Sequence, residues 1–362
     1  MTPNAKTRTD ISIAKAIGII LVVVGHAGAP GWLSDFLYEF HMPLFFIAAG
    51  YFFSPAKAGQ PWEFVGKRVK GLYLPFLKWG LAFLLLHNLF CHMGIINSYC
   101  GASPYTHTDI AKRAGWMIFM MAGYENHLLG AFWFLRSLFV ASLLFMGLYC
   151  LLTRSFHIRK PETAALVILL LMTGITTYLR AYSISLGVAQ GGYRECAGTV
   201  FYAIGVLYRS YERKIPFNAW MLAASVAVVA GFSVCCKSMM AYNASLKMFY
   251  AILVPGFFGW LMAYYAGRYL VRTPLSGALA YIGNHSMEIL ALHFLSFKAV
   301  SALKTVCYGL PAEEIGRHPI IGGNNEFFWI LYTLAGVALP LGICALYRYL
   351  KRSLPLKQTT TD

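Results

Sequence analysis

The stretch AKAIGIILVVVGH, residues 14–26, places a cation and an imidazole at the two ends of an apolar run. Lys15 and His26 are eleven residues apart. On a helix they therefore lie within about 20° of one face and about 16 Å apart along the axis. An imidazole takes up a proton near physiological pH, and an ammonium group binds anions such as phosphates. The pair predicts a proton-transfer group at one depth of a helix and an anion-binding group at another.

Each of the two residues also has a structural interpretation. Lys15 is typical of a lysine that anchors the cytoplasmic end of a membrane helix, with its ammonium reaching the interface. His26 is compatible with an imidazole that hydrogen-bonds a neighbouring helix. Because ionisable groups inside a membrane are costly, a functional role is the first hypothesis to test.

The composition predicts that the chain is a membrane protein. Of its 362 residues 58% are hydrophobic and 12% charged, and the mean hydropathy is +0.59, values far from those of a soluble domain. A backbone in lipid must satisfy its own hydrogen bonds, and the apolar runs exceed the roughly 10 residues of a barrel strand. We therefore expect an all-α membrane bundle of about ten transmembrane helices, which forms one domain over residues 1–362 without an appended soluble domain. The ten apolar segments lie at about 15–30, 36–53, 71–90, 131–152, 162–180, 195–208, 218–236, 248–267, 276–297 and 326–347.

The distribution of positive charge predicts the orientation. The net charge is +16, and most of the 30 lysines and arginines fall on one side of the membrane if the N-terminus is cytoplasmic. The dense clusters GKRVK, RSFHIRK and RSYERK are among them. We therefore expect both termini in the cytoplasm. Because no single basic face or nucleic-acid motif gathers these residues, the expected partner is the lipid bilayer and not nucleic acid.

The cysteines indicate neither a zinc ribbon nor a redox motif, because the eight are spread without a CxxC pattern. Cys91 and Cys100 share a predicted outer loop, where they either form a disulfide in an oxidising compartment or stay free. His87, Cys91 and His92 offer three metal ligands without an evident fourth, so no metal is expected. Nothing in the sequence indicates an oligomeric state.

An arginine inside the apolar segment WFLRSLF must face a cavity, a carboxylate or the interface. This residue, Arg136, is expected either to stabilise a developing negative charge or to form an ion pair with Glu288 or Glu39. Glu288 follows His285 by three residues and shares its helix face. We expect it to orient a histidine or to neutralise Arg136.

Three further segments extend the pattern of the opening stretch: FHMPLFFIAAGYFF (40–53), GAFWFLRSLF (130–139) and YIGNHSMEILALHF (281–294). At these residues the chain resembles the acyltransferase-3 family of integral-membrane acyltransferases, particularly bacterial members that O-acetylate sugars and are grouped as fucose 4-O-acetylase-like. Lys15-x10-His26 matches the family's Arg/Lys-x10-His signature, and the family's MPLFF…GY segment follows at a suitable distance. The likeness runs from about Arg8 to the last apolar segment.

The resemblance implies a ten-helix enzyme of the bacterial inner membrane. It would move an acyl group, most simply acetyl, from cytoplasmic acetyl-CoA to a hydroxyl of a sugar or glycan at the outer face. His26 would be essential, as a general base on the acceptor hydroxyl or as a covalent acyl carrier. Lys15 would hold the anionic nucleotide end of the donor, together with Lys67, Arg68 and Lys70.

The remaining candidates concern the oxyanion and the acceptor. Arg136, His41 and His293 are candidate donors to the developing oxyanion. His293 falls on the family's late histidine, although a packed, hydrogen-bonded histidine explains it equally well. Arg194, in GGYREC, and Glu39 are candidate contacts to the acceptor, and an interfacial anchor is the simpler account of Arg194.

The chain departs from the family's pattern at three points. Lys15 replaces the commoner arginine and loses its bidentate fork. Ala48-Ala49-Gly50 stands where Ser-Gly is frequent, and no extracellular esterase-like domain follows the bundle. A transporter or exporter of a polar solute or glycan is the alternative function, although we find no two-half repeat in its favour.

Overall fold

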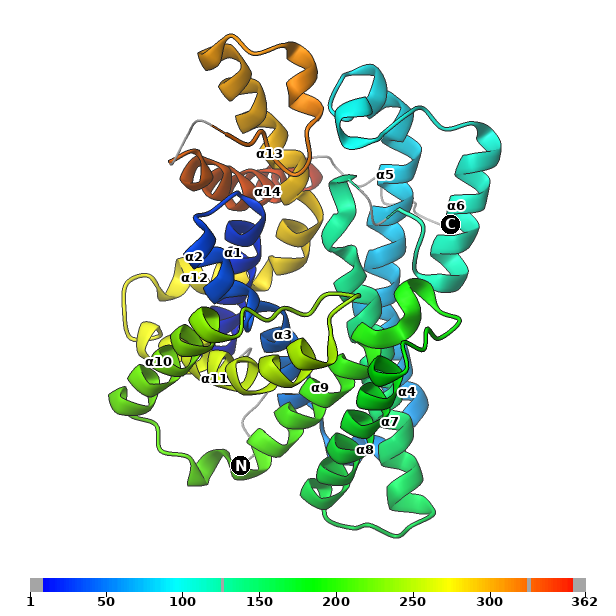
Figure 1. The fold of residues 1–362 in the computed structure, drawn as a ribbon, viewed down its shortest axis with the longest axis vertical. Coiled ribbons are helices and arrows are strands. Elements are labelled where there is room, and N and C mark those ends of the chain that lie inside the picture. The colour runs from blue at the N-terminus through cyan, green and yellow to red at the C-terminus, as the bar shows by residue number, and fades with distance from the viewer. Residues whose placement is uncertain (1–8, 125–126, 324–326, 354–362) are drawn as a thin grey trace, which may run out of the picture.

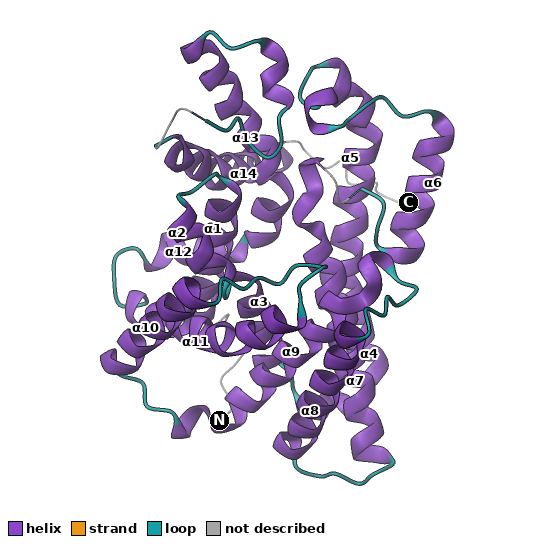
Figure 2. Cartoon of the chain, in the orientation of Figure 1, coloured by secondary structure: helices purple, strands orange, loops and turns teal. Residues whose placement is uncertain are grey.

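The computed structural model describes residues 9–124, 127–323 and 327–353, and within these ranges the chain is helical and contains no strand (Figures 1 and 2). The predicted all-α class is confirmed. The longer helices are α1 (Thr9–His26), α5 (Leu74–His92), α7 (Trp133–Arg154), α8 (Pro161–Ala181), α9 (Tyr193–Tyr211), α10 (Ala219–Cys235), α11 (Leu246–Leu270), α13 (Ser286–Tyr308) and α14 (Phe328–Ser353). The shorter ones are α2 (Gly31–Tyr38), α3 (His41–Tyr51), α4 (Pro61–Arg68), α6 (His107–Met120) and α12 (Ser276–Asn284). Single turns complete the chain: η1 (Pro55–Gly59), η2 (Val69–Tyr73), η3 (Ser98–Cys100), η4 (His127–Phe132), η5 (Ala189–Gly192), η6 (Glu212–Lys214) and η7 (Ala312–Gly316).

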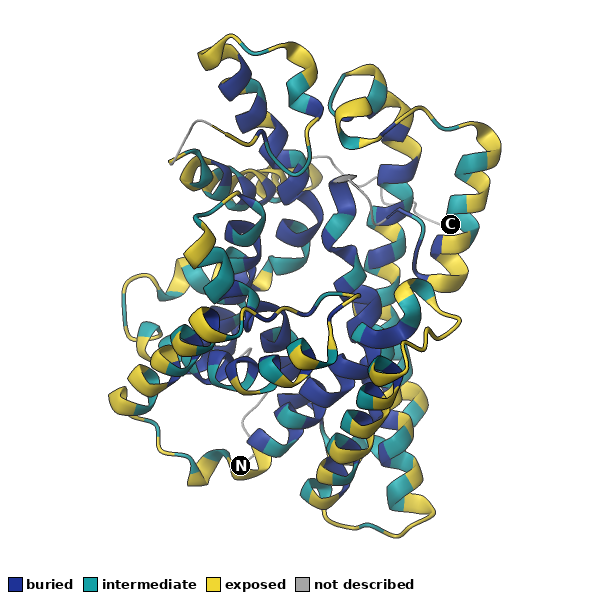
Figure 3. Ribbon diagram, viewed as in Figure 1, coloured by how far each residue is buried: buried dark blue, intermediate teal, exposed yellow. Residues whose placement is uncertain are grey.

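The helices form a polytopic membrane bundle. In the described part of the chain seven helical segments are long and apolar enough to cross a bilayer: Thr9–His26, Pro61–His92, Leu128–Arg154, Pro161–Ala181, Leu246–Leu270, Ser286–Tyr308 and Phe328–Lys351. Peripheral helices such as α14 expose large apolar side chains, whereas α1 and α13 are buried over most of their length (Figure 3). Exposed leucines suit a surface whose solvent is lipid. The count of ten spans and the cytoplasmic placement of both termini stay predictions.

Helix α1, which carries Lys15 and His26, lies at the centre of the bundle (Figure 1). It packs against α2, α3, α11, α12, α13 and α14. Tyr38, at the end of α2, donates a hydrogen bond of 2.8 Å from its hydroxyl to the carbonyl of Gly25 in the last turn of α1. This bond satisfies one of the carbonyls that a helix end leaves without an intrahelical partner. The last turn of α1, beside His26, is thus held in part by a neighbouring helix.

The predicted segment 36–53 is two short helices and not one span. The chain breaks between α2 and α3 at Glu39 and Phe40. Pro43 explains the break, because it has no N–H to bond the carbonyl four residues earlier and its ring collides with that carbonyl. A helix that begins at His41 places Pro43 in its first turn, where it is tolerated. With 11 residues, α3 is too short to cross the bilayer alone.

The predicted segment 276–297 also differs from the structure, in its middle and at its C-terminal end. His285 separates α12 from α13, and α13 continues to Tyr308. Gly283 allows α12 to cross α1 closely, because a Cβ there would lie 1.8 Å from the carbonyl oxygen of Ser12. Lys298 and Lys304, which the sequence places in an outer loop, consequently lie on α13 and are buried.

Glycines also allow a close contact between α3 and α9. A Cβ at Gly50 would lie 1.9 Å from the carbonyl oxygen of Tyr202, and a Cβ at Gly205 would lie 2.1 Å from that of Ile47. The two helix backbones therefore touch directly. Close approach at small residues is a usual way for helices to associate in membranes.

We predict that Gly205→Ala destabilises the protein by about 2 kcal/mol, because the added methyl must push α9 away from α3. The measurement is the midpoint of thermal unfolding in detergent. Gly174→Ala is the matched control, since Gly174 lies on α8 with no atom near its Cβ position, and an alanine suits a helix interior better than glycine. An equal midpoint for both variants would contradict the close contact.

Candidate active site

A cavity of about 250 Å³ follows one face of α1. Lys15, Ile19 and Val22 line it from α1, and they are spaced so that the next residue on the same face is His26. The remaining walls come from α3, α7 and α13 and from the turns beside them: Met42, Phe45, Ala48, Ala49, Phe52, Leu72, Phe134, Leu135, Leu138, Ser286, Met287 and Leu290. Apart from Lys15 and Ser286 the lining is apolar. The cavity is thus an apolar passage with an ammonium at one end and an imidazole just beyond the other.

His26 lies beside His293 of α13. The two rings are stacked with centroids 5.5 Å apart and an interplanar angle of 26°, and Phe294 packs against both, with its centroid 4.9 Å from that of His26 and 4.0 Å from that of His293. His293 follows Leu290 by three residues, so α13 leads from the cavity wall to the pair just as α1 does. The two histidines that the sequence singled out separately therefore form one site.

The hydrogen bonds of His293 define its tautomer. Its Nδ1 lies 3.0 Å from the carbonyl oxygens of both Ile289 and Leu290. A carbonyl only accepts, so Nδ1 carries the proton and the neutral ring presents Nε2 as an acceptor. This Nε2 is buried and has no hydrogen-bond partner within the described structure. An orphaned, fully buried imidazole nitrogen is unusual in a folded protein and indicates a ligand or a proton-transfer role.

Two more imidazoles surround the pair. His41 and His318 lie within electrostatic range of His26. His41, the first residue of α3, has its Nδ1 2.7 Å from the carbonyl oxygen of Leu37, so its ring too is fixed by the backbone. The ring centroid of His318 is 4.8 Å from that of Phe294. The end of the cavity is therefore a cluster of imidazoles in an aromatic setting.

The residues of the expected cationic clamp lie on the segment that leads to Leu72, which lines the cavity. Arg68 donates a 2.9 Å hydrogen bond to the hydroxyl of Tyr202 and packs on that ring and on the ring of Phe64. Lys67 is exposed and pairs with Glu63, and Lys70 is exposed on the π-helical turn η2.

Lys57, which the sequence did not single out for this clamp, joins it from η1. Burial is the main cause that lowers the pKa of Lys57, and the charges of Lys67 and Arg68 lower it further. The three cations are thus close enough to repel one another. Such a cluster attracts a polyanion.

Arg136 is buried in a network of its own between α7 and α9. Its Nε donates to Glu195 at 3.1 Å, and Glu195 also accepts a 2.8 Å hydrogen bond from Ser137. The other guanidinium nitrogens bond the side chain of Gln190 and the carbonyl of Met121. The expectation of an ion pair is confirmed, but the expected partners, Glu288 and Glu39, were wrong. The network supports a structural role for Arg136.

Glu288 and Glu39 lie elsewhere. Glu288 is off the cavity face of α13 and within electrostatic range of Cys344 on α14, and among the described residues it has no ion pair or hydrogen bond. It orients no histidine, because His285 bonds the carbonyl of Tyr281 instead. Glu39 is fully buried, and its carboxylate accepts hydrogen bonds from the backbone N–H and hydroxyl of Ser238. This carboxylate fastens the break between α2 and α3, which leaves it no room for an acceptor.

Arg194 borders the Arg136 network and is only partly buried. Its guanidinium lies 3.7 Å from the ring centroid of Trp133, and it donates to Gln190 at 2.7 Å and to the carbonyl of Met240 at 3.1 Å. Gln190 thereby accepts from both arginines. These contacts favour the anchoring interpretation of Arg194 over contact with an acceptor.

The cysteines and the metal-ligating residues show no assembled site. Cys91 and Cys100 are free thiols, and no group of three His, Cys, Asp or Glu side chains among the described residues is arranged to hold a metal ion. His87 instead bonds Tyr124 at 2.9 Å and stacks on Tyr105.

The sequence did not identify two residues of these networks, Glu195 and His318. Glu195 is the first residue of the predicted apolar segment 195–208. A carboxylate at the start of such a segment needs a partner, and this requirement could have indicated its pairing with Arg136. His318 comes from a loop between α13 and α14, where no periodicity points to the site.

The fold and this site define a multi-pass helical membrane protein with a histidine pair at the end of an intramembrane cavity. The chain matches the family model described as an acyltransferase domain over residues 8–349. It therefore belongs to the acyltransferase-3 family and is a membrane acyltransferase, as the resemblance predicted. The comparison with curated proteins gave no significant match, and neither did the comparison with solved structures.

We predict that Arg136→Met alone lowers the free energy of unfolding by roughly 3 to 5 kcal/mol, because it leaves the Glu195 carboxylate buried without its partner. The double variant Arg136→Met, Glu195→Met should be more stable than Arg136→Met. Thermal unfolding in detergent of the wild type, both single variants and the double variant measures this coupling. Losses that simply add would show that the pair does not interact.

Proposed function

We propose that this protein transfers an acetyl group from cytoplasmic acetyl-CoA to a hydroxyl of a sugar or cell-surface glycan, as a multi-pass enzyme of the bacterial inner membrane. The observation that supports this proposal most directly is the cavity that Lys15, Ile19 and Val22 line along α1, one helical turn before His26, which pairs with His293. Membership of an acyltransferase family favours this function over the exporter that composition left open.

The two ends of the proposed donor match the charged end and the apolar walls of the cavity. Acetyl-CoA has a phosphate-bearing nucleotide at one end and a thin arm with the thioester at the other. Lys15, with Lys57, Lys67, Arg68 and Lys70 nearby, would hold the phosphates, while the apolar walls accept the arm. Only a chain without charge enters such a passage at low cost.

The transfer itself would take place at the histidine pair. In the direct route an imidazole of the pair, His26 first, removes the proton of the acceptor hydroxyl as the oxygen attacks the thioester carbonyl carbon. The C–S bond breaks, and the leaving thiolate takes up the proton from the imidazolium. In the covalent route His26 first forms an acyl-imidazole with loss of the thiol, and the acceptor oxygen then displaces the imidazole. The geometry is compatible with both routes.

His293 is the best-placed assistant to His26. Its orphaned Nε2 lies in the buried site, and its Nδ1 is held by two carbonyls, so the ring is already oriented before any ligand binds. Protonated at Nε2, it would donate to the oxyanion of the tetrahedral intermediate, while neutral it would accept a proton. His41 is a second candidate, whereas the contacts of Arg136 assign that arginine to the Glu195 network.

We predict that His26→Ala lowers acetyl transfer by roughly 10² to 10⁴-fold, the contribution of a general acid–base group. The assay gives purified protein in detergent radiolabelled acetyl-CoA and a pool of hydroxylated glycans, and follows label in the glycan fraction. His92→Ala is the matched control, because His92 is an exposed histidine at the end of α5. If His26→Ala stays folded and retains full turnover, His26 has no part in the reaction.

We predict that Lys15→Ala raises the KM for acetyl-CoA by roughly tenfold and makes it less sensitive to salt, because a charged contact to phosphate is lost. Lys15→Arg should retain most of the affinity. Lys78→Ala serves as the control, since Lys78 is an exposed lysine on α5 that does not line the cavity. An unchanged KM in Lys15→Ala would identify Lys15 as a membrane anchor.

A further inference from the structure

A second hollow, of about 360 Å³, opens at the other side of the histidine pair. Ala27 and Gly28, the two residues that directly follow His26, form part of its wall. The other lining residues come from the loop after α13 and from α13 and α14: Lys304, Ile320, Ile321, Gly322, Gly323, Phe328, Trp329 and Tyr332. The cavity at Lys15 and this hollow share no lining residue, and along α1 His26 lies between Val22, which lines the cavity, and Ala27, which lines the hollow.

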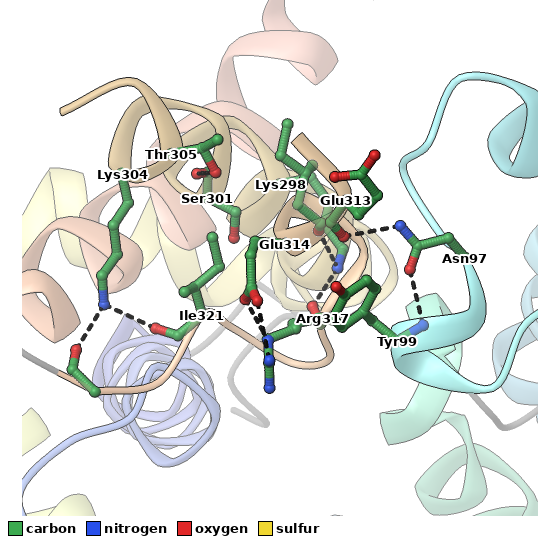
Figure 4. Close-up of polar contacts among 12 residues, drawn as sticks. Asn97, Tyr99, Lys298, Ser301, Lys304, Thr305, Glu313, Glu314, Arg317 and Ile321 are labelled. Atoms are coloured by element: carbon green, nitrogen blue, oxygen red, sulfur yellow. Dashed lines mark hydrogen bonds and ion pairs between the residues drawn. The ribbon is translucent and has the colours of Figure 1, made fainter. Parts of the chain in front are cut away.

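Two buried lysines of α13 hold the loop wall of the hollow in place. The ammonium of Lys304 donates to the carbonyl oxygens of Ile321 and Gly323, each at 2.9 Å, and that of Lys298 donates to the carbonyls of Ile315 and Arg317. Figure 4 shows both ammonium groups reaching from the helix into the loop. Because buried ammonium groups must be hydrogen-bonded, these contacts fix residues 315–323 against α13.

The clamped loop connects the hollow to the reacting groups. The ring of His318, within this loop, packs at a tilt against Phe294, which in turn contacts both His26 and His293. On the side of α1, the side chain of Ile320 reaches the position that a Cβ on Gly28 would occupy, at 2.3 Å. The loop therefore closes over the His26 end of α1 at a glycine whose φ of +77° also favours glycine.

The surface of the hollow is suited to a hydroxyl-rich molecule. An ammonium has three N–H donors and Lys304 uses two of them on the loop, which leaves one for a ligand. Backbone carbonyls of the loop and the hydroxyl of Tyr332 add further polar groups, while the indole of Trp329 offers a flat apolar surface. This mixture differs from the nearly uniform apolar lining of the first cavity. A lipid tail would leave the third N–H of the Lys304 ammonium without an acceptor, and the nucleotide end of CoA would meet a single cation.

We propose that this hollow binds the acceptor, as a sugar residue that presents one hydroxyl to His26 across Ala27. The proposal rests on the proposed function and specifies where its second substrate lies. Donor and acceptor then reach His26 from opposite sides, the thioester through the cavity at Lys15 and the hydroxyl through the hollow at Lys304. The sugar's remaining hydroxyls would bond the loop carbonyls and the Lys304 ammonium, with the ring packed on Trp329.

The test uses two variants of the full-length protein in detergent, Trp329→Ala and Gly322→Phe. The first removes the apolar surface, and the second adds bulk at a position where a Cβ meets no atom within 4 Å. Methyl glycosides of neutral hexoses and of hexuronic acids serve as acceptors with labelled acetyl-CoA. We expect each variant to raise the KM for the glycoside by roughly tenfold, as for the loss of an aromatic anchor. The KM for acetyl-CoA and its slow hydrolysis without acceptor should stay at the wild-type values.

Gly277→Phe is the matched control, because Gly277 is an exposed, equally open glycine on α12 that lines neither space. If the wild type transfers acetyl to a glycoside but both variants keep its KM, the hollow is not the acceptor site while the proposed function stands. A parallel rise in the KM for acetyl-CoA would also overturn the assignment, because it would show a general distortion of the site. Absence of transfer by the wild type to any glycoside or glycan would instead reject the proposed function.

Discussion

The structure depends on one constraint, which is that each polar group inside an apolar bundle needs a partner from the protein itself. The Arg136 guanidinium is matched by Glu195, the Glu39 carboxylate by Ser238, and the ammonium groups of Lys298 and Lys304 by loop carbonyls. In each case the partner comes from a different segment of the chain. These bonds therefore fix how the helices and the loops between them are arranged. Against this background the unpartnered Nε2 of His293 is an exception, and it lies beside His26.

The features that could be predicted from the sequence are those that depend on local spacing. The all-α class follows from the apolar runs, and the shared face of Lys15 and His26 follows from the helical period, since Ile19 and Val22 complete the same stripe along the cavity. The partner of Arg136 could not be predicted in the same way, because Glu195 is 59 residues away and spacing carries no information at that separation. The sequence indicated that a carboxylate was needed without identifying it.

Helix breaks were the second feature that hydropathy failed to show. The apolar run around Pro43 contains a single carboxylate, Glu39, so its hydropathy still indicates one span, whereas Pro43 divides α2 from α3. The end of α13 at Tyr308 could not be predicted for the opposite reason. Lys298 and Lys304 suggested a loop, because a lysine in a membrane segment is costly unless carbonyls solvate it. Those carbonyls belong to a loop that comes later in the chain, and its return over α13 cannot be deduced from composition.

The departures from the family's usual residues have a consistent physical consequence. Ala48 and Ala49 line the cavity where a serine is frequent, so this position adds no hydroxyl to the apolar lining. Lys15 in place of arginine keeps the charge at the cavity end but gives up the planar fork, which fits a phosphate that is bound by several cations together. Lys15 is the one charged residue that lines the cavity, and the other walls are nearly all apolar. His26 and His293 are therefore the nearby groups able to move a proton at the far end. An enzyme that must bring a thioester and a hydroxyl together while keeping water from the thioester gains from this arrangement.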